Sequence, residues 1–456
     1  MSELPSGWAR TTLGTVADWG AGGTPSRSEP KFYGGKIPWI KSGELNSRYI
    51  KTTEESITEE AIKSSSAKIF PAGSVAIAMY GATIGKTAIL GIDASTNQAC
   101  AVGVPVDGLI GKEYLYRLLQ NEKAAFIEKG KGGAQPNISQ AVIKAHEIGL
   151  PPLAEQTRIA AKLEELLAQV DTLKARIDGI PALLKRFRQS VLAAAVSGQL
   201  TEEWRLKIAS ADQLDHSAYP EVPLDSLADF QNGFAFKSDW FSKTGDIQVA
   251  KIGNVRNGKV DLDNSPAFVS YEVGSEYQRF MTLEGDILLS MTGTKYKRDY
   301  GNACSAPAGI LVNQRVGKLR PQRDKVDGRF LLLCLQTAGF REQFFSGETG
   351  QVSQGNVGSE HIKKCLIPSP PIEEQAEIVY RTAQLFAFAE QVEAKVVLAK
   401  SRVDHLAQSI LAKAFRGELV PQDPNDEPAS VLLERIKAQR AAMPKAKRGR
   451  QAAKLS

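Results

Sequence analysis

The stretch PPLAEQ at Pro151–Gln156 recurs as PPIEEQ at Pro370–Gln375, 219 positions further along the chain. The same offset maps QSVLA at Gln189–Ala193 onto QSILA at Gln408–Ala412. Self-similarity at a fixed period is the sequence signature of a repeated structural unit. The chain of 456 residues is therefore predicted to contain one unit in two copies.

The similarity continues upstream of these stretches, but it is weaker and its offset drifts. Pro71–Met79 resembles Leu283–Met291 at an offset of 212, and Leu13–Asp18 matches Leu224–Asp229 at an offset of 211. Short runs rich in Val and Ile, broken by Gly, Pro and Asn, predict strands and turns here, with a helix at Lys112–Glu128. We infer that the globular parts share one fold with small loop insertions and have diverged more than the segments that follow them.

Each Pro-Pro step predicts the start of a long helix, because proline suits the first turn of a helix and not its middle. Apolar residues then recur at spacings of four and three, the pattern of a coiled-coil seam. The predicted seam residues are Ile159, Leu163, Leu166, Val170, Leu173, Ile177 and Leu184 in the first helix, and Ile378, Leu385, Val392, Val396, Val403 and Leu406 in the second. A helix from Gln156 to Ser197 would be roughly 63 Å long at about 1.5 Å per residue. Pro181 predicts a kink near Gly179.

The simplest cover for the first seam is the second helix, packed antiparallel. The predicted fold class is therefore α+β, with two α/β domains separated by two long antiparallel coiled-coil helices in a pseudo-two-fold internal repeat. The predicted segments are a globular domain at 1–150, a helix at 151–200, a linker at 201–220, a second globular domain at 221–369, a second helix at 370–419, and a C-terminal segment at 420–456 with a short helix at Val431–Ala442 and a basic tail.

The composition, 42% hydrophobic and 24% charged, is that of a soluble globular protein. The longest clean apolar stretch, Phe330–Leu335, is far shorter than the about 20 residues of a membrane span. The first ten residues lack the basic start and apolar core of a signal peptide. We therefore expect a cytoplasmic protein with no membrane partner.

The net charge of +6 rests on five basic residues in the last thirteen positions, since the rest of the chain has 52 basic and 51 acidic residues. A nucleic-acid surface would have to concentrate its charge on one face. The four cysteines form no CxxC pair, and the four histidines are scattered and lie at no matching positions in the two copies. Neither a disulfide framework nor a metal site is predicted.

Two glycine-rich segments resemble ligand loops but depart from the required patterns. Gly81–Thr87 has three residues between its first glycine and the Gly-Lys, where a phosphate-binding loop needs four. Asp18–Gly23 resembles the turn that holds S-adenosylmethionine in methyltransferases, but its copy at Asp229–Gly233 loses most of the glycines. Turns between strands explain both segments equally well. The sequence supplies no catalytic constellation of Ser, His, Asp or Cys.

The sequence contains more residues suited to binding DNA than residues suited to catalysis. Lys295–Tyr300 interleaves basic and aromatic residues directly after a predicted strand, which suits contacts to phosphates and bases. Amides in glycine-rich loops, which can pair with adenine edges, lie before the Pro-Pro step in both copies. The candidate DNA-binding residues are Lys41, Tyr80, Thr83, Lys86, Lys131, Gln135, Asn137, Lys251, Lys295, Tyr296, Lys297, Arg298, Gln351, Gln354 and Asn356.

The duplicated helical motifs at Leu150–Trp204 and Ser369–Leu419, with PAGSVAIAMYGATIGK and EGDILLSMTGT in the globular parts, resemble the specificity subunit of type I restriction–modification enzymes. The resemblance covers essentially the full chain. It implies that 1–150 and 221–369 are target-recognition domains, each reading one half of a bipartite, asymmetric site in double-stranded DNA.

The resemblance also implies partners and the division of chemistry among them. The helices would set the gap between half-sites and dock two modification subunits, which carry S-adenosylmethionine and methylate adenine at N6. Two restriction subunits would add ATP- and Mg-dependent translocation and cleavage. This chain itself would bind no cofactor and no metal, and would not be an enzyme by itself.

Three hypotheses therefore stay open on the residues alone. The first is the specificity subunit. The second is an enzyme, either a methyltransferase using Asp18–Gly22 or a nucleotidase using Gly81–Thr87. The third is a stand-alone DNA-binding or coiled-coil scaffold protein.

Overall fold

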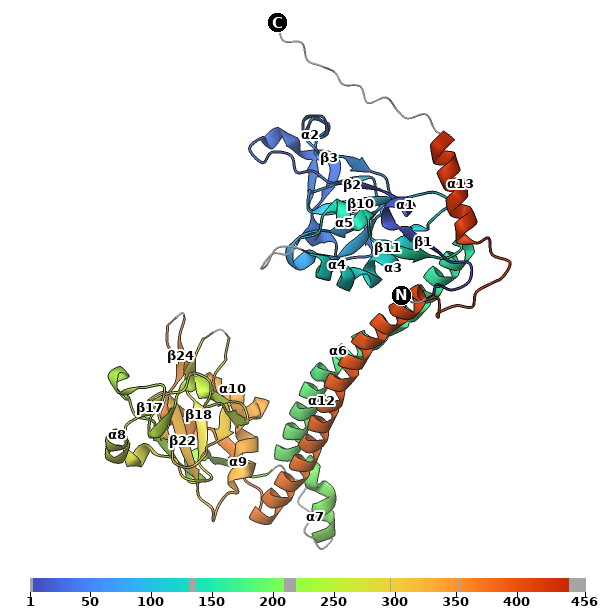
Figure 1. Ribbon diagram of the computed structural model, residues 1–456. Coiled ribbons are helices and arrows are strands. Elements are labelled where there is room, and N and C mark those ends of the chain that lie inside the picture. Colours follow the sequence, from blue (N-terminus) through green and yellow to red (C-terminus); the bar gives the residue numbers. More distant parts are fainter. Residues whose placement is uncertain (1–2, 131–136, 209–218, 296, 352, 443–456) are drawn as a thin grey trace. The chain divides into compact units, whose positions relative to one another are not determined.

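The computed structural model (Figure 1) describes residues 3–130, 137–208, 219–295, 297–351 and 353–442. The chain forms two compact units: unit 1 contains Met1–Ile177 with Ala399–Ser456, and unit 2 contains Asp178–Leu398. Helices α6 (Leu153–Val196) and α12 (Ile372–Phe415) each contribute one part to each unit. This division cuts both long helices, whereas the predicted segment boundaries keep each helix whole.

The first sheet has the same strand order in both units. In unit 1 the order is β2-β10-β7-β8-β4, and in unit 2 it is β13-β22-β18-β20. The strands are β2 (Ala17–Ala21), β10 (Cys100–Pro105), β7 (Val75–Ala78), β8 (Thr87–Leu90) and β4 (Tyr49–Ile50), and β13 (Ala228–Asn232), β22 (Val316–Pro321), β18 (Ile287–Ser290) and β20 (Ala303–Ser305). The four shared strands pair antiparallel in both units, so the drifting offsets reflect loop insertions within one topology.

A second sheet repeats as well. Its central strand pairs antiparallel with one neighbour and parallel with the other, in the orders β5-β3-β9-β6 and β17-β14-β21. The strands are β5 (Glu55–Ile57), β3 (Tyr33–Ile40), β9 (Ala94–Thr96) and β6 (Ile69–Phe70), and β17 (Phe268–Val269), β14 (Ile247–Ala250) and β21 (Leu311–Val312). Smaller pairings are β1 (Ala9–Thr12) with β11 (Glu147–Leu150), β12 (Glu221–Pro223) with β25 (Leu366–Pro368), β15 (Val255–Arg256) with β16 (Lys259–Val260), and β19 (Thr292–Gly293), β24 (Gly355–Val357) and β23 (Glu348–Thr349).

Among the shorter helices, those that start at Lys112 and Gln140 in unit 1 correspond to those that start at Gly328 and Ser359 in unit 2, at offsets of 216 and 219. Unit 1 has α1 (Leu13–Val16), α2 (Glu59–Ser64), α3 (Lys112–Asn121), α4 (Lys123–Lys129), α5 (Gln140–Lys144) and α13 (Ala429–Ala442), and unit 2 has α7 (Glu202–Ile208), α8 (Tyr271–Glu276), α9 (Gly328–Leu335), α10 (Ala338–Ser346) and α11 (Ser359–Lys364). The predicted helix Lys112–Glu128 is thus two helices, α3 and α4, which meet at Glu122. The predicted C-terminal helix at Val431–Ala442 is confirmed as α13.

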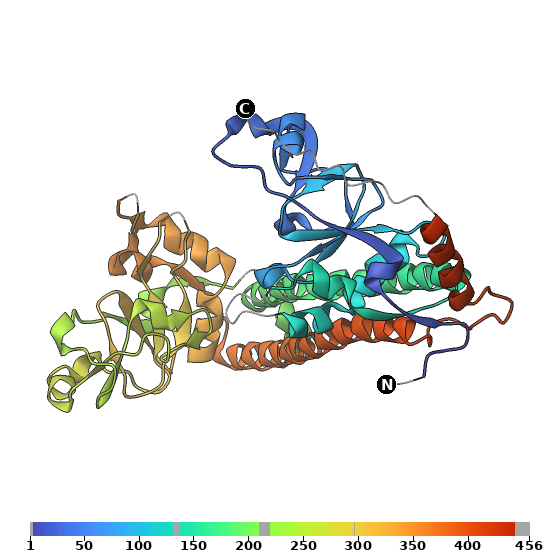
Figure 2. The same ribbon diagram turned by 45° about the horizontal axis from the view of Figure 1, so that its top comes forward.

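The long helices run antiparallel within each unit. In unit 1, Arg158 near the start of α6 pairs with Asp426 beyond the end of α12 at 2.6 Å, and Lys174 pairs with Asp404 at 2.8 Å. In unit 2, Arg188 pairs with Glu393 at 2.7 Å. As the residue number rises along α6, the number of its partner along α12 falls, so the helices are antiparallel, as the sequence predicted. The two helices lie side by side in both views (Figures 1 and 2).

The predicted kink residue does not end the helix. Helix α6 continues through Pro181 as one element of 44 residues. Both long helices are followed by a glycine in the left-handed region, Gly198 at φ 84° and Gly417 at φ 75°. A glycine in this conformation is the common way to end a helix, because it carries no Cβ that would clash.

Not all of the predicted seam residues are buried between the helices. Ile159, Leu163, Val170, Leu184 and Ile378 are buried, and Leu166, Ile177, Leu385, Val392, Val396 and Val403 are partly buried. Leu173 is 44% exposed and Leu406 is 46% exposed, so their assignment to the seam is corrected. Leu167 and Ala407 pack into the unit 1 core instead. A straight helix turns once per 3.6 residues, so a strict heptad pattern drifts off the buried face.

The glutamine of each PPxxEQ motif ties its long helix to the neighbouring domain. The Gln156 Oε1 atom accepts the Gly111 N–H at 3.2 Å, and the Gln375 Oε1 atom accepts the Asp327 N–H at 2.8 Å. Gly111 and Asp327 are the residues that precede helices α3 and α9. A backbone N–H at a helix start needs a hydrogen-bond acceptor, because the helix itself offers none. The glutamine side chain of the motif supplies this acceptor in both units.

The glutamate of each motif meets different partners. Glu155 accepts the Trp8 Nε1–H at 3.1 Å, and burial raises the pKa of this carboxyl. Glu374 accepts from the Thr201 hydroxyl at 2.6 Å, from the Tyr219 hydroxyl at 2.5 Å and from the guanidinium of Arg205. In unit 2 the segment that follows α6 is therefore fastened to the start of α12.

The core of unit 1 uses residues from both ends of the chain. Leu4 and Trp8 pack with Leu432 and Ile436 of α13, and the Ala429 N–H donates to the Gly7 carbonyl at 2.9 Å. Figure 2 shows α13 beside the first domain. No helix in the described part of the chain is long and apolar enough to cross a membrane.

Candidate nucleic-acid interface

Asn137 and Asn356 occupy equivalent places beside the end of a central strand. Asn137 forms an antiparallel bridge with Tyr80, and Asn356 pairs with Thr292 between β24 and β19. The residue after each asparagine donates its N–H to the methionine carbonyl that precedes Tyr80 or Thr292, at 3.0 Å in both units. The side chains differ: Tyr80 is 45% exposed, whereas the Thr292 hydroxyl donates to the Asn356 Oδ1 atom at 2.7 Å. The same backbone pairing thus carries different side chains, with different hydrogen-bonding groups, in the two units.

The basic loop of unit 2 folds against a neighbouring turn. The Lys295 Nζ atom donates to the Gly350 carbonyl at 3.0 Å, which places these two residues side by side. The Asp299 carboxylate accepts the Thr294 N–H at 2.7 Å, and this hydrogen bond lowers its pKa. Lys297 and Arg298 are exposed. Arg298 has a φ of 46°, a conformation that costs free energy in a residue with a side chain.

Lys41 and Lys251 stand at the same place in the two units. Each precedes a short 3-10 helix after the central strand of the second sheet, and its N–H donates to a side-chain oxygen three residues later, at 2.6 Å in unit 1 and 2.8 Å in unit 2. The side chains then diverge. Lys41 pairs with Glu54 at 2.7 Å and Glu55 at 3.1 Å, whereas the Lys251 Nζ atom lies 5.4 Å from the Phe241 ring centre.

The segment Gly81–Thr87 is a turn between two strands. A 3-10 turn at Gly81–Thr83 follows β7, and β8 begins at Thr87, so the lysine is followed by a strand and not by the helix of a phosphate-binding loop. The Thr83 hydroxyl donates to the Tyr80 carbonyl at 2.8 Å, and the Lys86 Nζ atom donates to Asn46 at 2.7 Å. This geometry contradicts the nucleotidase reading of the segment.

The segment Asp18–Gly23 is also packed against its own chain. Gly22 and Gly23 donate their N–H groups to the carbonyls of Cys100 and Thr96, at 3.1 and 2.9 Å. A Cβ on Gly22 would lie 2.2 Å from the Asn97 carbonyl oxygen. The glycines are therefore explained by close backbone approach, which contradicts the methyltransferase reading.

The cysteine thiols lie in apolar surroundings. Burial raises the pKa of Cys100 and of Cys304 to about 12, which disfavours the reactive thiolate. Among the described residues, no three His, Cys, Asp or Glu side chains converge as metal ligands.

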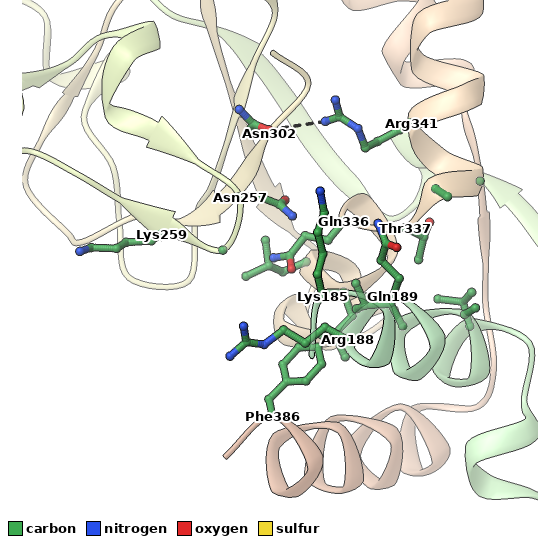
Figure 3. A pocket seen from close by; sticks show the side chains of 18 of the residues that line it. Lys185, Arg188, Gln189, Asn257, Lys259, Asn302, Gln336, Thr337, Arg341 and Phe386 are labelled. Atoms are coloured by element: carbon green, nitrogen blue, oxygen red, sulfur yellow. Dashed lines mark hydrogen bonds between the residues drawn. The ribbon is translucent and has the colours of Figure 1, made fainter. Parts of the chain in front are cut away.

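Each unit has a groove between its domain and the long helices. The unit 1 groove has a volume of about 470 Å³, and its lining includes Lys86, Arg117, Gln120, Asp171 and Leu411. The unit 2 groove, of about 1080 Å³, is shown in Figure 3, and its lining includes Lys185, Leu192, Arg298, Gln336, Arg341 and Glu390. Basic side chains outnumber acidic ones in both linings.

Comparison with known proteins decides the family. The family model for the type I restriction modification DNA specificity domain matches twice, at residues 5–182 and 217–396. The type I restriction enzyme EcoKI specificity subunit of Escherichia coli (strain K12) is 33% identical, over 96% of this chain and 97% of that protein. The chain belongs to the type I specificity-subunit family.

Other relatives agree with this assignment. The StySPI specificity subunit of Salmonella potsdam is 32% identical, over 96% of each chain. The crystal structure of the HsdS subunit from Thermoanaerobacter tengcongensis shares the fold, with a TM-score of 0.59, 19% identity, and coverage of 92% of this chain and 99% of that one. The predicted family and the α+β architecture of two domains with two long helices are confirmed.

The structure of this specificity subunit gathers part of the predicted interface. In unit 1, Tyr80, Thr83, Lys86 and Asn137 lie around one turn. In unit 2, Lys295, Lys297, Arg298 and Asn356 lie in adjoining segments, next to a turn that carries the exposed Gln351 and Gln354. Lys41 and Lys251 belong to the second sheet of each unit. The predictions for Lys131, Gln135 and Tyr296 lie outside the described residues.

The sequence reasoning missed two groups of residues. The paired roles of Gln156 and Gln375 could have been inferred, because both belong to the repeated motif. The cations of the grooves, such as Lys185 and Arg341, come from segments far apart in the sequence, and no local pattern connects them.

Proposed function

We propose that this specificity subunit supplies DNA-sequence recognition to a type I restriction–modification complex and performs no catalysis itself. Each globular domain reads one half of a bipartite, asymmetric site in double-stranded DNA. The long helices set the gap between half-sites. Two readers held on a helical spacer suit contacts about one DNA turn apart, roughly 34–36 Å.

One observation carries this proposal. The two units repeat the same strand order, yet equivalent frames display different side chains, as at Tyr80 with Asn137 and Thr292 with Asn356. A protein that binds the same DNA sequence with both domains would not need different side chains at equivalent positions. A reader of two different half-sites requires it, since base edges are discriminated by the donors and acceptors that face them.

The rest of the proposed complex lies in partner chains. Two modification subunits dock on the long helices, bind S-adenosylmethionine, and methylate one adenine in each half-site at N6. Two restriction subunits use ATP and Mg for translocation and cleavage. The complex acts in the cytoplasm, where its DNA substrate is located, and has no membrane partner.

Mapping methylated adenines in the host genome by single-molecule sequencing, with and without this gene, tests the proposal. We expect one bipartite motif to lose methylation in the deletion strain. Replacing residues 221–369 with the matching region of a relative should change one half-site only. Lengthening both long helices between the domains should change the gap and leave both half-sites intact.

Other outcomes favour other functions. If methylation is unchanged in the deletion strain and the chain with its modification subunits does not select DNA sequences, a coiled-coil scaffold replaces this proposal. If a swap of one domain changes both half-sites, the modular reading of the two domains is wrong.

A further inference from the structure

The two grooves occupy equivalent places in the repeat. Gln120 of α3 and Gln336, which directly follows α9, line the domain side and are related by the offset of 216 that relates these helices. Asp171 corresponds to Glu390, and Leu192 to Leu411, at the helix offset of 219. The same cleft therefore recurs, although the domain walls have diverged. Because the groove is present in both copies although the residues around it differ, we infer that it has the same function in both.

Both grooves carry an excess of positive charge. The unit 1 lining has four basic residues and one acidic residue, and the unit 2 lining has five basic residues and three acidic ones. Arg48 is held by Glu113 and Glu164, and Arg188 by Glu393. Among the described residues, the remaining groove cations have no carboxylate partner; they are Lys86, Arg117 and Lys123 in unit 1, and Lys185, Lys259, Arg298 and Arg341 in unit 2.

Two arginines in unit 2 share one aromatic ring. The guanidinium carbons of Arg298 and Arg341 lie 5.0 and 5.1 Å from the centre of the Phe345 ring. Arg341 donates to the carbonyls of Gly301 and Arg298, each at 2.9 Å. Burial and the charge of Arg298 both lower the pKa of Arg341. Like charges gathered at a partly buried place are stabilised when an anion binds between or beside them.

The same loop delivers a cation to the groove in each unit. Lys86 ends the loop that leads to β8, and Arg298 lies in the corresponding loop that leads to β20. These loops also carry Tyr80 and Lys295, which belong to the proposed DNA-reading surface. An anion in the groove is thus adjacent to the reading loops, which favours DNA over an acidic peptide of a partner subunit.

We propose that each groove binds the phosphodiester backbone of duplex DNA alongside the half-site read by its own domain. This inference rests on the proposed function. The groove lysines and arginines that form no ion pair among the described residues contact phosphate oxygens, and such contacts fix the register of a protein on DNA without reading its bases.

Salt dependence of binding tests the proposal, because each phosphate contact releases counterions and steepens the loss of affinity with salt by about 0.9 in the log–log slope. The probe is a random-sequence duplex of about 40 base pairs, since phosphate contacts do not require the cognate site. The test variant is Lys185→Gln with Lys259→Gln in the full-length chain. The matched control is Lys243→Gln with Lys325→Gln, two exposed lysines of unit 2 outside the groove.

We expect the test variant to lower the slope by about 1.8 and the affinity at 0.15 M salt by about 30-fold, one phosphate per lysine, while the control stays at the wild-type values. In unit 1, Arg117→Gln with Lys123→Gln should have a similar effect. Thermal unfolding of each variant checks that the fold is kept. The methylation motif in the host should be unchanged, because these contacts carry no sequence information.

The opposite results are equally clear. A test variant with the wild-type slope, or a wild-type chain that does not bind the duplex at 50 mM salt, overturns the groove assignment. If the variant instead loses association with the modification subunit at an unchanged DNA slope, the groove is a protein-docking surface. In each case a bipartite methylation motif in the host would leave the proposed function standing.

Discussion

Replacing Leu432 of α13 by alanine should destabilise unit 1 and leave unit 2 unaffected. Leu432 is 2% exposed and packs in the core that also contains Trp8 and Ile159. Loss of a buried leucine side chain costs its transfer free energy and leaves a cavity, which together amount to about 2.7–5.0 kcal/mol. Alanine is a slightly better helix former, so we take about 3 kcal/mol as the expected loss.

This loss translates into a measurable shift. Unit 1 comprises 235 residues, Met1–Ile177 with Ala399–Ser456. For a domain of this size, about 1 kcal/mol moves the melting temperature by roughly 2–4 °C, so unit 1 should melt about 6–12 °C lower. Hydrogen exchange in increasing urea, read by mass spectrometry, assigns the loss to peptides of each unit separately.

The neighbouring residue supplies the control. Val431 is 48% exposed, so Val431→Ala should change the stability by no more than about 0.5 kcal/mol. If Leu432→Ala leaves the exchange of residues 3–130 unchanged, or affects peptides of unit 2 instead, α13 is not part of the first core and the reasoning fails.

Further predictions concern the motif residues and one ion pair. Glu374→Ala should destabilise unit 2 by about 3 kcal/mol, since it leaves the partly buried Arg205 without its carboxylate partner, whereas replacement of the exposed Glu373 by alanine should be neutral in the same urea titration. Gln375→Ala should cost about 1–3 kcal/mol and lower the exchange protection of the Asp327 amide, because that N–H loses its acceptor; wild-type protection would refute this. Glu55 has its pKa lowered from 4.5 to about 2, first by the hydrogen bond from Arg27 and then by that from Lys41. Its contribution to stability is present above pH 4.5 and is lost as the pH falls toward 2, so Glu55→Gln should flatten the acid dependence of unit 1 unfolding over this range, and an unchanged profile would count against the pairing.

The repeat made much of the fold predictable from the sequence. The Pro-Pro steps, the apolar spacing and the repeat defined both long helices to within a few residues. The antiparallel packing followed from the need to cover a seam. The predicted exposure of individual seam residues was less successful, as Leu173 and Leu406 show, because a heptad template does not follow the 3.6-residue turn of a straight helix.

The places of the candidate interface residues in the fold were predictable only where a local sequence pattern indicated them. The asparagines before the Pro-Pro steps were identified because they occupy matching places in the repeat. The pairing of Lys41 with Glu54 and Glu55 could not be foreseen, since it depends on how the second sheet folds. The same holds for Arg298 and Arg341, which are 43 residues apart and meet at one ring.

The core shared by both ends of the chain bears on the order in which the protein is made. Unit 2 is encoded as one continuous stretch, Asp178–Leu398, whereas unit 1 needs residues on both sides of it. On the ribosome, the internal unit can therefore complete its core first. The first domain, although synthesised earliest, waits with an uncovered apolar face until Ala429–Ile436 emerges. Nascent chains halted before this helix would expose Trp8 and its neighbours, and would be the form most in need of a chaperone.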